Sequence, residues 1–367
     1  MMAAKRNEGI VERVTVKTIA EMANVSIGTV DRALNGRGRI NPDTKERILK
    51  IAKMMNYTPN RTAQALKRQR QIRIGIVMAD TPIQFCDHLR HGIEDALGEM
   101  DDYGIVGEFL LSHSLSARDQ MEVVSGIEPE RFDAFLINAG SEEIGGWIDQ
   151  MADQGKTVAT FNSDTPNSRR LFHVGENPYR AGMLIGGYIS QCLDREDPLV
   201  AILTGFPGNT SHDLRCRGVM DTIASLYPSV RFLQDNYYDS ENVVEEKLND
   251  MLIRRNENVD AIFLSSGIGI DKASIIAAAL PQGRRPMVFG YDINADVLPF
   301  MDMDICRACA FQDPYWQSYY AMTILGRCCL SGKKPTREFY KVRTKLITKY
   351  NAADYLMDKQ QSDEFLI

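Results

Sequence analysis

The sequence predicts a small helix-turn-helix head followed by an α/β body of two doubly wound lobes with parallel sheets. Three short helical patterns fill residues 14–59, and from residue 72 onward short apolar runs alternate with helical stretches. The chain has 367 residues, which is more than one ordinary core accommodates. These observations together indicate several domains of two different classes.

The composition is that of a folded protein in water. Hydrophobic residues make up 44% and charged residues 25% of the chain, which excludes a largely disordered or fibrous protein. No apolar run approaches the ~20 residues that a membrane helix needs, and residues 1–13 lack the apolar segment of a secretory signal. Seven cysteines, odd in number and irregularly spaced, predict reduced thiols rather than a disulfide framework. We therefore expect a cytoplasmic protein with no membrane partner.

The charge is divided unevenly along the chain. Residues 1–70 hold 15 Lys and Arg against 6 Asp and Glu, a balance of +9, whereas the remaining residues have a balance of −15. A basic head on an acidic body is typical of a nucleic-acid-binding module attached to a domain with another task. Charge alone is equally compatible with a solvated basic tail.

The head is predicted to consist of three helices after an N-terminal arm, residues 1–13, that shows no periodicity. The first helix covers residues 16–23, and Ser26 is a good N-cap for the second. The third starts with Asn41 as its cap and Pro42 at the first helical position, where proline is favourable. The short turn between the first two helices predicts a helix-turn-helix.

The second helix is the element predicted to read DNA in the major groove. Ile27, Gly28 and Arg32 are expected on its outward, N-terminal side, where side chains meet base edges. Arg32 can pair with guanine, whereas Ile27 and Gly28 offer only apolar contact or close approach. Arg37 is a candidate phosphate contact. The predicted DNA-contact residues of the head are Ser26, Ile27, Gly28, Thr29, Arg32, Asn35 and Arg37.

The body contains nine β-type runs, most of them separated by 12–25 residues of helical pattern. That number exceeds what one such sheet usually needs, so two lobes are predicted. The predicted strands cover residues 72–79, 104–111, 132–138, 157–162, 199–205, 230–234, 260–266, 286–292 and 306–311. Residues 345–352 look like a closing strand.

Residues 14–67 resemble the head and hinge of the lac repressor (LacI/GalR) family of transcription regulators. The resemblance is carried by VS-x-x-TV-x-R, the NG-R turn, the Y-x-PN close and the A-x-x-L hinge. It implies that a segment opening at Asn60, itself a DNA-contact candidate, forms a hinge helix when two subunits lie side by side on operator DNA. Leu66 then enters the minor groove, where an apolar side chain unstacks a base step. The alternative is a basic linker in which Leu66 is incidental.

The remainder of the chain is similar, with lower fidelity, to periplasmic sugar-binding proteins, which implies two lobes that enclose a small ligand. The predicted domains are the arm over residues 1–13, a DNA-binding domain over 14–59, a hinge over 60–71 and a ligand-sensing body over 72–367. The N-lobe is expected at about 72–162 and 293–325, and the C-lobe at about 163–292 and 326–367.

The ligand-binding residues are expected at the carboxyl ends of the strands, where such sheets bind their ligands. Arg215, Asp292 and Gln312 match residues that the family uses: an arginine suited to adjacent hydroxyls, an acidic acceptor and an amide. Asn162 and Ser266 depart from the common family pattern, which leaves the identity of the ligand open. The full set, with an aromatic ring for a sugar face, is Phe85, Asn162, Asp164, Arg215, Ser266, Asp292 and Gln312.

No catalytic residue, cofactor or metal is predicted. The five histidines lack metal-binding spacing, and no P-loop, GxSxG or GxGxxG motif is present. Cys306 and Cys309 form a CxxC, but on a strand their side chains are expected on opposite faces, which prevents shared ligation.

The sequence thus predicts a DNA-binding transcription regulator, by the family's common mode a repressor. It is expected to bind a pseudo-palindromic operator as a homodimer under allosteric control by a small ligand, a sugar or polyol. A transport-type sugar-binding protein and a sugar-modifying enzyme are the alternatives that share this body.

Overall fold

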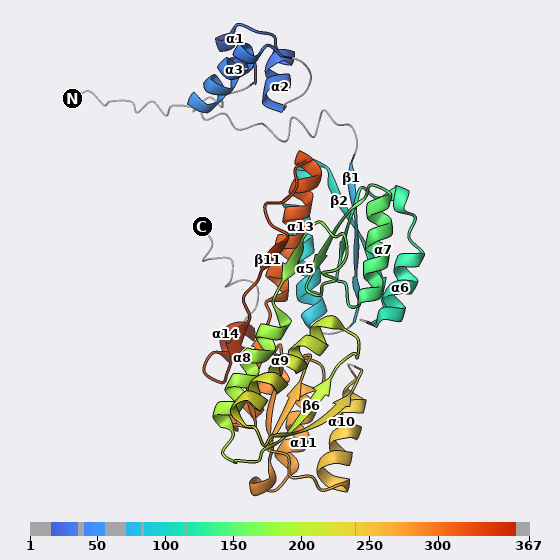
Figure 1. The fold of residues 1–367 in the computed structure, drawn as a ribbon, viewed down its shortest axis with the longest axis vertical. Helices are drawn as coiled ribbons and strands as arrows, with labels where there is room; N and C mark the ends of the chain where they lie inside the picture. Colours follow the sequence, from blue (N-terminus) through green and yellow to red (C-terminus); the bar gives the residue numbers. More distant parts are fainter. Residues whose placement is uncertain are drawn as a thin grey trace, which may run out of the picture. The chain divides into compact units, whose positions relative to one another are not determined.

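A computed structural model describes residues 16–35, 40–55, 71–81, 84–114, 116–238 and 240–356 (Figure 1). The chain divides into two compact units, residues 1–70 and 71–367, which are described separately. The expected hinge therefore lies almost wholly outside the described residues, as do Arg37, Asn60 and Leu66.

The head consists of three short helices, as predicted. They are α1 (Val16–Ala23), α2 (Ile27–Asn35) and α3 (Pro42–Met54). Asn24 ends α1 with a φ of 48°, a left-handed conformation that asparagine tolerates better than most residues. The Ser26 hydroxyl then caps α2 by accepting from the Thr29 amide at 3.2 Å, and Asn41 caps α3 by accepting from the Asp43 amide.

The head is held together by one small apolar core. Ile19 of α1, Val30 of α2 and Ile48 of α3 are completely buried against one another's helices. Small residues such as Ala20 and Ala33 fill the remaining space and allow the helices to approach closely. The exposed side of α2 is thereby fixed relative to the other two helices.

The body contains two six-stranded sheets, one for each lobe (Figure 1). The N-lobe sheet is entirely parallel, in the order β11-β5-β4-β3-β1-β2, and the C-lobe sheet has the order β12-β10-β9-β8-β6-β7 with only β12 antiparallel. The N-lobe strands are β1 (Ile72–Ala79), β2 (Ile105–Ser112), β3 (Ala134–Ile137), β4 (Thr157–Phe161), β5 (His173–Gly175) and β11 (Phe339–Lys341). The C-lobe strands are β6 (Leu199–Thr204), β7 (Arg231–Asn236), β8 (Ala261–Leu264), β9 (Met287–Tyr291), β10 (Cys306–Phe311) and β12 (Lys345–Ile347).

Helices cover both faces of each sheet, which confirms the predicted doubly wound architecture (Figure 1). The N-lobe carries α5 (Gln84–Gly98) and α13 (Pro314–Ser331) on one face, and α6 (Ala117–Ser125) and α7 (Glu142–Asp153) on the other. The C-lobe carries α8 (Pro178–Cys192) and α9 (Thr210–Leu226) on one face, and α10 (Glu241–Asn249), α11 (Ile270–Ala279) and α12 (Leu298–Asp302) on the other. The short α14 (Ala352–Leu356) packs against the C-lobe core.

The chain crosses between the lobes at residues 176–177, 312–313 and 342–344, which corrects the predicted lobe boundaries. The strand β10 was assigned to the N-lobe, but it pairs with β9 and β12 in the C-lobe sheet. Conversely, β5 and β11 were placed in the C-lobe, although they extend the N-lobe sheet. Three-residue strands show no periodicity, so the sequence pattern could not reveal where the chain changes lobe.

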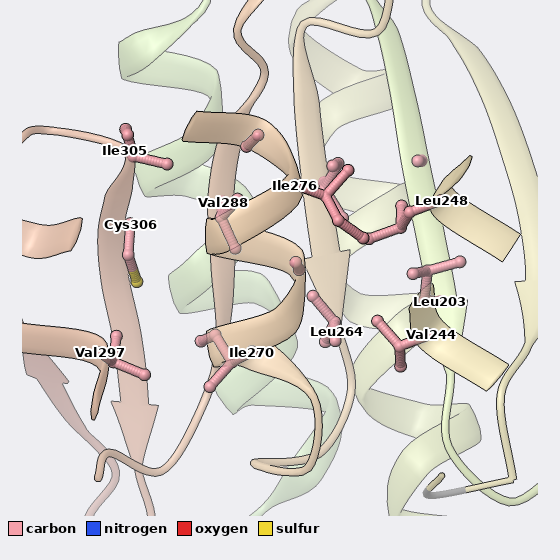
Figure 2. Close-up of a cluster of buried hydrophobic side chains, with 14 of the residues drawn as sticks. Leu203, Val244, Leu248, Leu264, Ile270, Ile276, Val288, Val297, Ile305 and Cys306 are labelled. Carbon is pink, nitrogen blue, oxygen red and sulfur yellow. The ribbon is translucent and has the colours of Figure 1, made fainter. Parts of the chain in front are cut away.

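In the core of the C-lobe, alternate side chains of a strand pack against helices on opposite faces of the sheet; Figure 2 shows one of these faces. On β6, Ala201 and Leu203 point toward α10 and α11, while Val200 and Ile202 point toward α8 and α9. Leu203 meets Val244 and Leu248 of α10 in a cluster of buried hydrophobic side chains (Figure 2). Both faces of the strand are buried, which explains why its sequence is a continuous apolar run.

The helices α8 and α9 pack with their backbones in near contact because glycines face each other. A Cβ atom added to Gly218 would overlap the Tyr179 carbonyl oxygen, and one added to Gly182 would overlap the Arg215 carbonyl oxygen. This close approach sets the position of α9, the helix that supplies several side chains to the site described below.

Gly218→Ala is therefore expected to lower the free energy of unfolding by about 1–3 kcal/mol, because the helices must separate. Gly187→Ala on α8 is the matched control, since a Cβ there meets no atom within 4 Å. Alanine at that half-buried helical position, where space is open, should raise stability by roughly 0.5–1 kcal/mol. Urea denaturation of both variants measures the difference, and equal effects would contradict the close-packing argument.

Candidate functional site

A cavity of about 230 Å³ lies between the two lobes of the body. It is smaller than the roughly 300–1,000 Å³ common for drug-sized ligands, so its size suits a small molecule. The N-lobe wall consists of Gln84, Phe85, Asn162 and Ser163. The C-lobe wall consists of Ser211, His212, Arg215, Glu241, Ser266, Gly267, Ile268, Gly269, Asp271, Asp292, Ile293, Asn294 and Gln312.

Two of these residues end their strands in an unusual backbone conformation. Asn162 follows β4 with a φ of 61°, and Asp292 follows β9 with a φ of 53°. The left-handed region is costly for residues other than glycine, and such strain concentrates at functional sites. In both residues this left-handed backbone conformation turns the chain sharply at the carboxyl edge of the sheet, next to the cavity.

Asp292 presents an unsatisfied hydrogen-bond acceptor. Its Oδ2 accepts from Gln312 Nε2 at 2.9 Å, whereas its Oδ1 is buried and has no partner among the described residues. Burial raises the pKa of Asp292 from 3.8 to about 6, although Arg215 and the Gln312 bond favour the charged form. An unpaired buried carboxylate oxygen at a cavity wall is suited to accept a hydrogen bond from a ligand hydroxyl.

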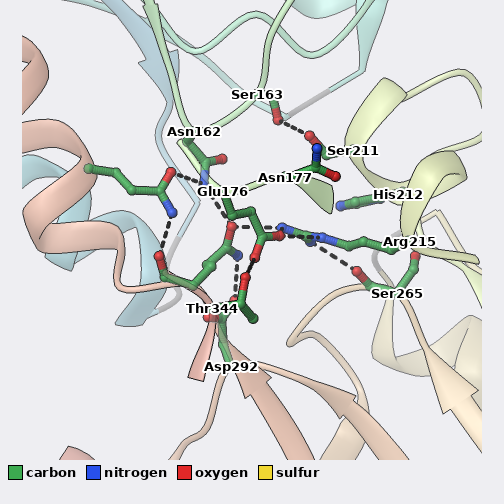
Figure 3. A network of polar contacts seen from close by, with 12 residues as sticks. Asn162, Ser163, Glu176, Asn177, Ser211, His212, Arg215, Ser265, Asp292 and Thr344 are labelled. Atoms are coloured by element: carbon green, nitrogen blue, oxygen red, sulfur yellow. Dashed lines mark hydrogen bonds and ion pairs between the residues drawn. The ribbon is translucent and has the colours of Figure 1, made fainter. Parts of the chain in front are cut away.

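Arg215 is almost completely buried, and its guanidinium is engaged by the protein itself (Figure 3). Its Nε and one terminal nitrogen donate to Glu176 Oε1 at 3.0 and 2.8 Å, and the same terminal nitrogen donates to Gln312 Oε1 at 2.7 Å. The other terminal nitrogen donates to the Ser265 carbonyl, and the group stacks 3.9 Å from the centre of the Tyr291 ring. Because four of five N–H groups are used, the fork that the sequence suggested for ligand hydroxyls is not free.

Glu176 is the acidic partner that sequence analysis missed, and it joins the three crossovers of the chain. Glu176 lies in the first crossover, Gln312 in the second and Thr344 in the third. The Thr344 hydroxyl donates to Glu176 Oε2 at 2.6 Å, while Arg215 bridges Glu176 and Gln312 (Figure 3). We call Glu176, Arg215, Gln312 and Thr344 the hinge cluster, after the three crossovers between the lobes. It is distinct from the predicted hinge over residues 60–71. The hinge cluster lies directly beside the cavity, because Arg215 and Gln312 belong to both.

The helix α9 contributes two further polar groups that were not predicted. His212 Nδ1 accepts from the Phe206 amide at 3.1 Å, so a neutral ring carries its proton on Nε2. Burial lowers the pKa of His212 to about 3, which keeps the ring neutral. Ser211 donates to the Ser163 hydroxyl at 3.2 Å and thereby links the two lobes across the cavity (Figure 3).

Six of the seven predicted ligand-binding residues line the cavity, and Asp164 does not. The Asp164 carboxylate is bound by Arg170 at 2.8 Å and by the Thr160 hydroxyl at 2.7 Å, close to the buried His173. These bonds anchor the loop after β4 and hold the carboxylate outside the cavity wall. The cavity is formed by Phe85, Asn162, Arg215, Ser266, Asp292 and Gln312 as predicted, and by the unpredicted residues given above.

Four of the predicted DNA-contact residues, Ser26, Ile27, Gly28 and Arg32, are exposed on the head. Ile27 has 52% of its surface exposed, and Ser26 and Gly28 beside it are exposed as well. Arg32 is exposed and donates to the Gly28 carbonyl at 3.1 Å, so its guanidinium lies along the same face. Thr29 is half-buried, and the side chain of Asn35 is outside the description.

Cys306 and Cys309 correct a further prediction, because their side chains point to the same face. The two Sγ atoms lie 3.9 Å apart in the C-lobe core. The register between β10 and β9 shifts between Cys306 and Ala308, and this bulge adds one residue that reverses the alternation. Within the described ranges, no group of three or more His, Cys, Asp or Glu side chains is placed to hold a metal ion.

Comparison with known proteins matches the two units to two families. Residues 15–60 match the model of bacterial regulatory proteins of the lacI family, and residues 74–334 match the periplasmic binding protein domain. No helix of the described residues is long and apolar enough to cross a membrane.

Among curated relatives, the protein named probable HTH-type transcriptional repressor ExuR of Bacillus subtilis is 27% identical over 57% of this chain. The regulator RegA of Clostridium saccharobutylicum is 32% identical over 41% of this chain. The chain spans only 60% and 45% of the lengths of these relatives.

Among solved structures, the glucose-galactose binding protein GanP of Geobacillus stearothermophilus superposes with a TM-score of 0.69 at 19% identity, over 77% of this chain and 99% of that one. A solute binding protein of Bacillus halodurans with bound myo-inositol gives a TM-score of 0.69 at 17% identity, over 78% and 97%. At these identities the likeness establishes the fold of the body. The chain belongs to the periplasmic binding protein domain family, whose model matches residues 74–334, and its head matches the lacI family of bacterial regulatory proteins over residues 15–60.

Proposed function

We propose that this protein is a sequence-specific DNA-binding transcription regulator, acting as a repressor, whose operator affinity is set by a small ligand in the interlobe cavity. The observation that carries this proposal is the combination of an exposed reading face on α2 with a polar cavity that contains an unsatisfied acceptor at Asp292. A transport-type binding protein does not need an exposed DNA-reading face. The working location that follows from DNA binding in bacteria is the cytoplasm.

The ligand class that the cavity favours is a neutral sugar or polyol. Asp292 Oδ1 accepts from a hydroxyl, His212 Nε2 donates to one, and Phe85 supplies a ring for an apolar face. An anionic ligand is disfavoured, because Arg215 is neutralised by Glu176 and the remaining charged residues of the wall are acidic. The relatives of the body that bind glucose, galactose or myo-inositol agree with this class.

The hinge cluster provides the route by which a ligand affects the head. Closure of the lobes on a ligand at Asp292 and Gln312 changes the contacts of Gln312 with Arg215 and therefore the geometry of all three crossovers. A ligand shifts the equilibrium between two body states only by its differential affinity, typically about 1–3 kcal/mol. In a homodimer on a pseudo-palindromic operator, this change alters the spacing of the two heads.

Selection of bound duplexes from a random DNA library tests the first half of this proposal. The wild-type protein is expected to enrich a two-fold symmetric site, and Arg32→Ala is expected to weaken binding to that site by about 1–3 kcal/mol and relax one position. Lys53→Ala, at an exposed position in the last turn of α3, is the matched control and should not relax any base. Enrichment of no sequence would sink the proposal.

A thermal-shift screen against monosaccharides, polyols, sugar acids and phosphosugars tests the second half. A ligand at 100 times its Kd stabilises the protein by about 2.7 kcal/mol, which raises Tm by several degrees. Any hit is then added to the DNA-binding assay, where it must change the affinity for the selected site. A ligand that stabilises the protein without changing its affinity for the selected DNA site would indicate a binding protein that is not a regulator.

A further inference from the structure

The segment over residues 337–345 includes β11 and the third crossover. It has one buried face and one exposed face. The even-numbered residues Tyr340, Val342 and Thr344 face inward, the first two onto the N-lobe core and the third onto Glu176. Side chains alternate in an extended chain, so the odd-numbered ones face solvent. The exposed residues are Arg337, Phe339, Lys341, Arg343 and Lys345.

This segment forms one wall of a groove of about 540 Å³ on the body, which shares no lining residue with the interlobe cavity. The residues of that wall are Arg337, Tyr340, Lys341, Val342, Arg343 and Lys345. The opposite wall is α13, which contributes Trp316 and Tyr320. Their rings stack with centroids 5.2 Å apart and an angle of 24°. The Tyr320 residue is 43% exposed, which leaves an aromatic surface open to a further ring. We call this site the α13 groove.

Among the described residues, the charge of the α13 groove is only partly neutralised. Lys345 is held by Asp313 at 2.8 Å, but none of the ion pairs formed by the described residues involves Arg337, Lys341 or Arg343. These three cations lie on a body whose overall balance is −15. Several cations of one sign beside stacked rings create a positive potential that attracts an external anion.

We propose that the α13 groove binds an anionic small molecule with a planar ring, of the mononucleotide class. Arg337, Lys341 and Arg343 bind the phosphate, because arginine offers paired donors and lysine a compact positive charge. The exposed Tyr320 ring stacks on the base. The proposal is independent of the proposed function, because it concerns a second site with different lining residues.

Calorimetric titration of the full chain with adenosine 5′-monophosphate at low ionic strength tests the proposal. Saturable binding is expected, and the double variant Lys341→Glu/Arg343→Glu should weaken it at least tenfold, since two attractive charges become repulsive. Tyr320→Ala should weaken it by about tenfold through loss of stacking. Arg180→Glu, at an exposed cation on α8 outside the groove, is the matched control and should bind as the wild type does.

Two partial probes separate the contributions of the ring and the phosphate. Ribose 5-phosphate lacks the ring and adenosine lacks the phosphate, so each is expected to bind at least tenfold more weakly than the intact nucleotide. Equal binding of ribose 5-phosphate and the nucleotide, or no saturable binding at millimolar nucleotide, would overturn the proposal. Loss of binding in Asp292→Asn with retention in the double variant would also overturn it, because the nucleotide would then occupy the interlobe cavity.

Discussion

Arg215→Ala is expected to lower the free energy of unfolding of the body by about 3–5 kcal/mol, because it leaves the Glu176 carboxylate buried without its ion-pair partner. Glu176 is only 2% exposed, so water cannot replace the guanidinium. The substitution also removes the donor to Gln312 and the cation stacked on Tyr291. In thermal denaturation the loss corresponds to a fall in Tm of roughly 6–15 °C.

Arg217→Ala is the matched control on the same helix. The Arg217 side chain is 71% exposed and lies 3.6 Å from Asp221, a surface pair whose contribution is at most about 1 kcal/mol. The double variant Glu176→Leu/Arg215→Met removes both charges of the buried pair, so it should be more stable than Arg215→Ala. Similar Tm values for Arg215→Ala and Arg217→Ala would show that Arg215 is not the centre of the hinge cluster.

Asp292→Asn is expected to stabilise the protein at neutral pH and to remove its response to the ligand. The folded state raises the pKa of Asp292 from 3.8 to about 6, so ionisation above that pH costs folding free energy, on the order of 1–3 kcal/mol. The wild type therefore loses this stability as pH rises through 6, whereas the variant does not. The asparagine oxygen still accepts from Gln312, but the charged acceptor for a ligand hydroxyl is gone.

Two measurements check this expectation. The Tm difference between Asp292→Asn and the wild type should be positive at pH 8 and shrink as pH falls through 6 toward 4. The affinity for the ligand found by screening should fall about 10- to 100-fold, the range for a hydrogen bond to a charged group. Asp296→Asn, at an exposed carboxylate after the same strand, is the control and should change neither quantity. A Tm difference independent of pH would contradict the raised pKa.

Local patterns predicted the elements of this protein well, because each depends on neighbouring residues. The cap at Asn41, the proline at the start of α3 and the apolar run of β6 all specify their structure within a few positions. The resemblance to a known family, together with the rule that such sheets bind ligands at strand ends, pointed to six residues that line the cavity.

The features that were missed depend on residues far apart in the sequence. Glu176 lies 39 positions from Arg215, and nothing near it indicates that it meets a guanidinium. Asp164 follows a strand end as the ligand residues do, but its carboxylate is bound by Arg170, six residues later in the chain. The bulge in β10 depends on pairing with β9 and is invisible in the strand's own sequence. Such contacts arise only when the tertiary structure brings the partners together.

The triple crossing of the chain has a consequence for how the body assembles during synthesis. The N-lobe sheet is incomplete until β11 is made, and α13, which covers one of its faces, follows ten strands of both sheets in the sequence. Neither lobe is therefore a continuous piece of chain that can complete its core before the other. The body should emerge from the ribosome as two unfinished halves that become stable together, and it should melt in one cooperative transition.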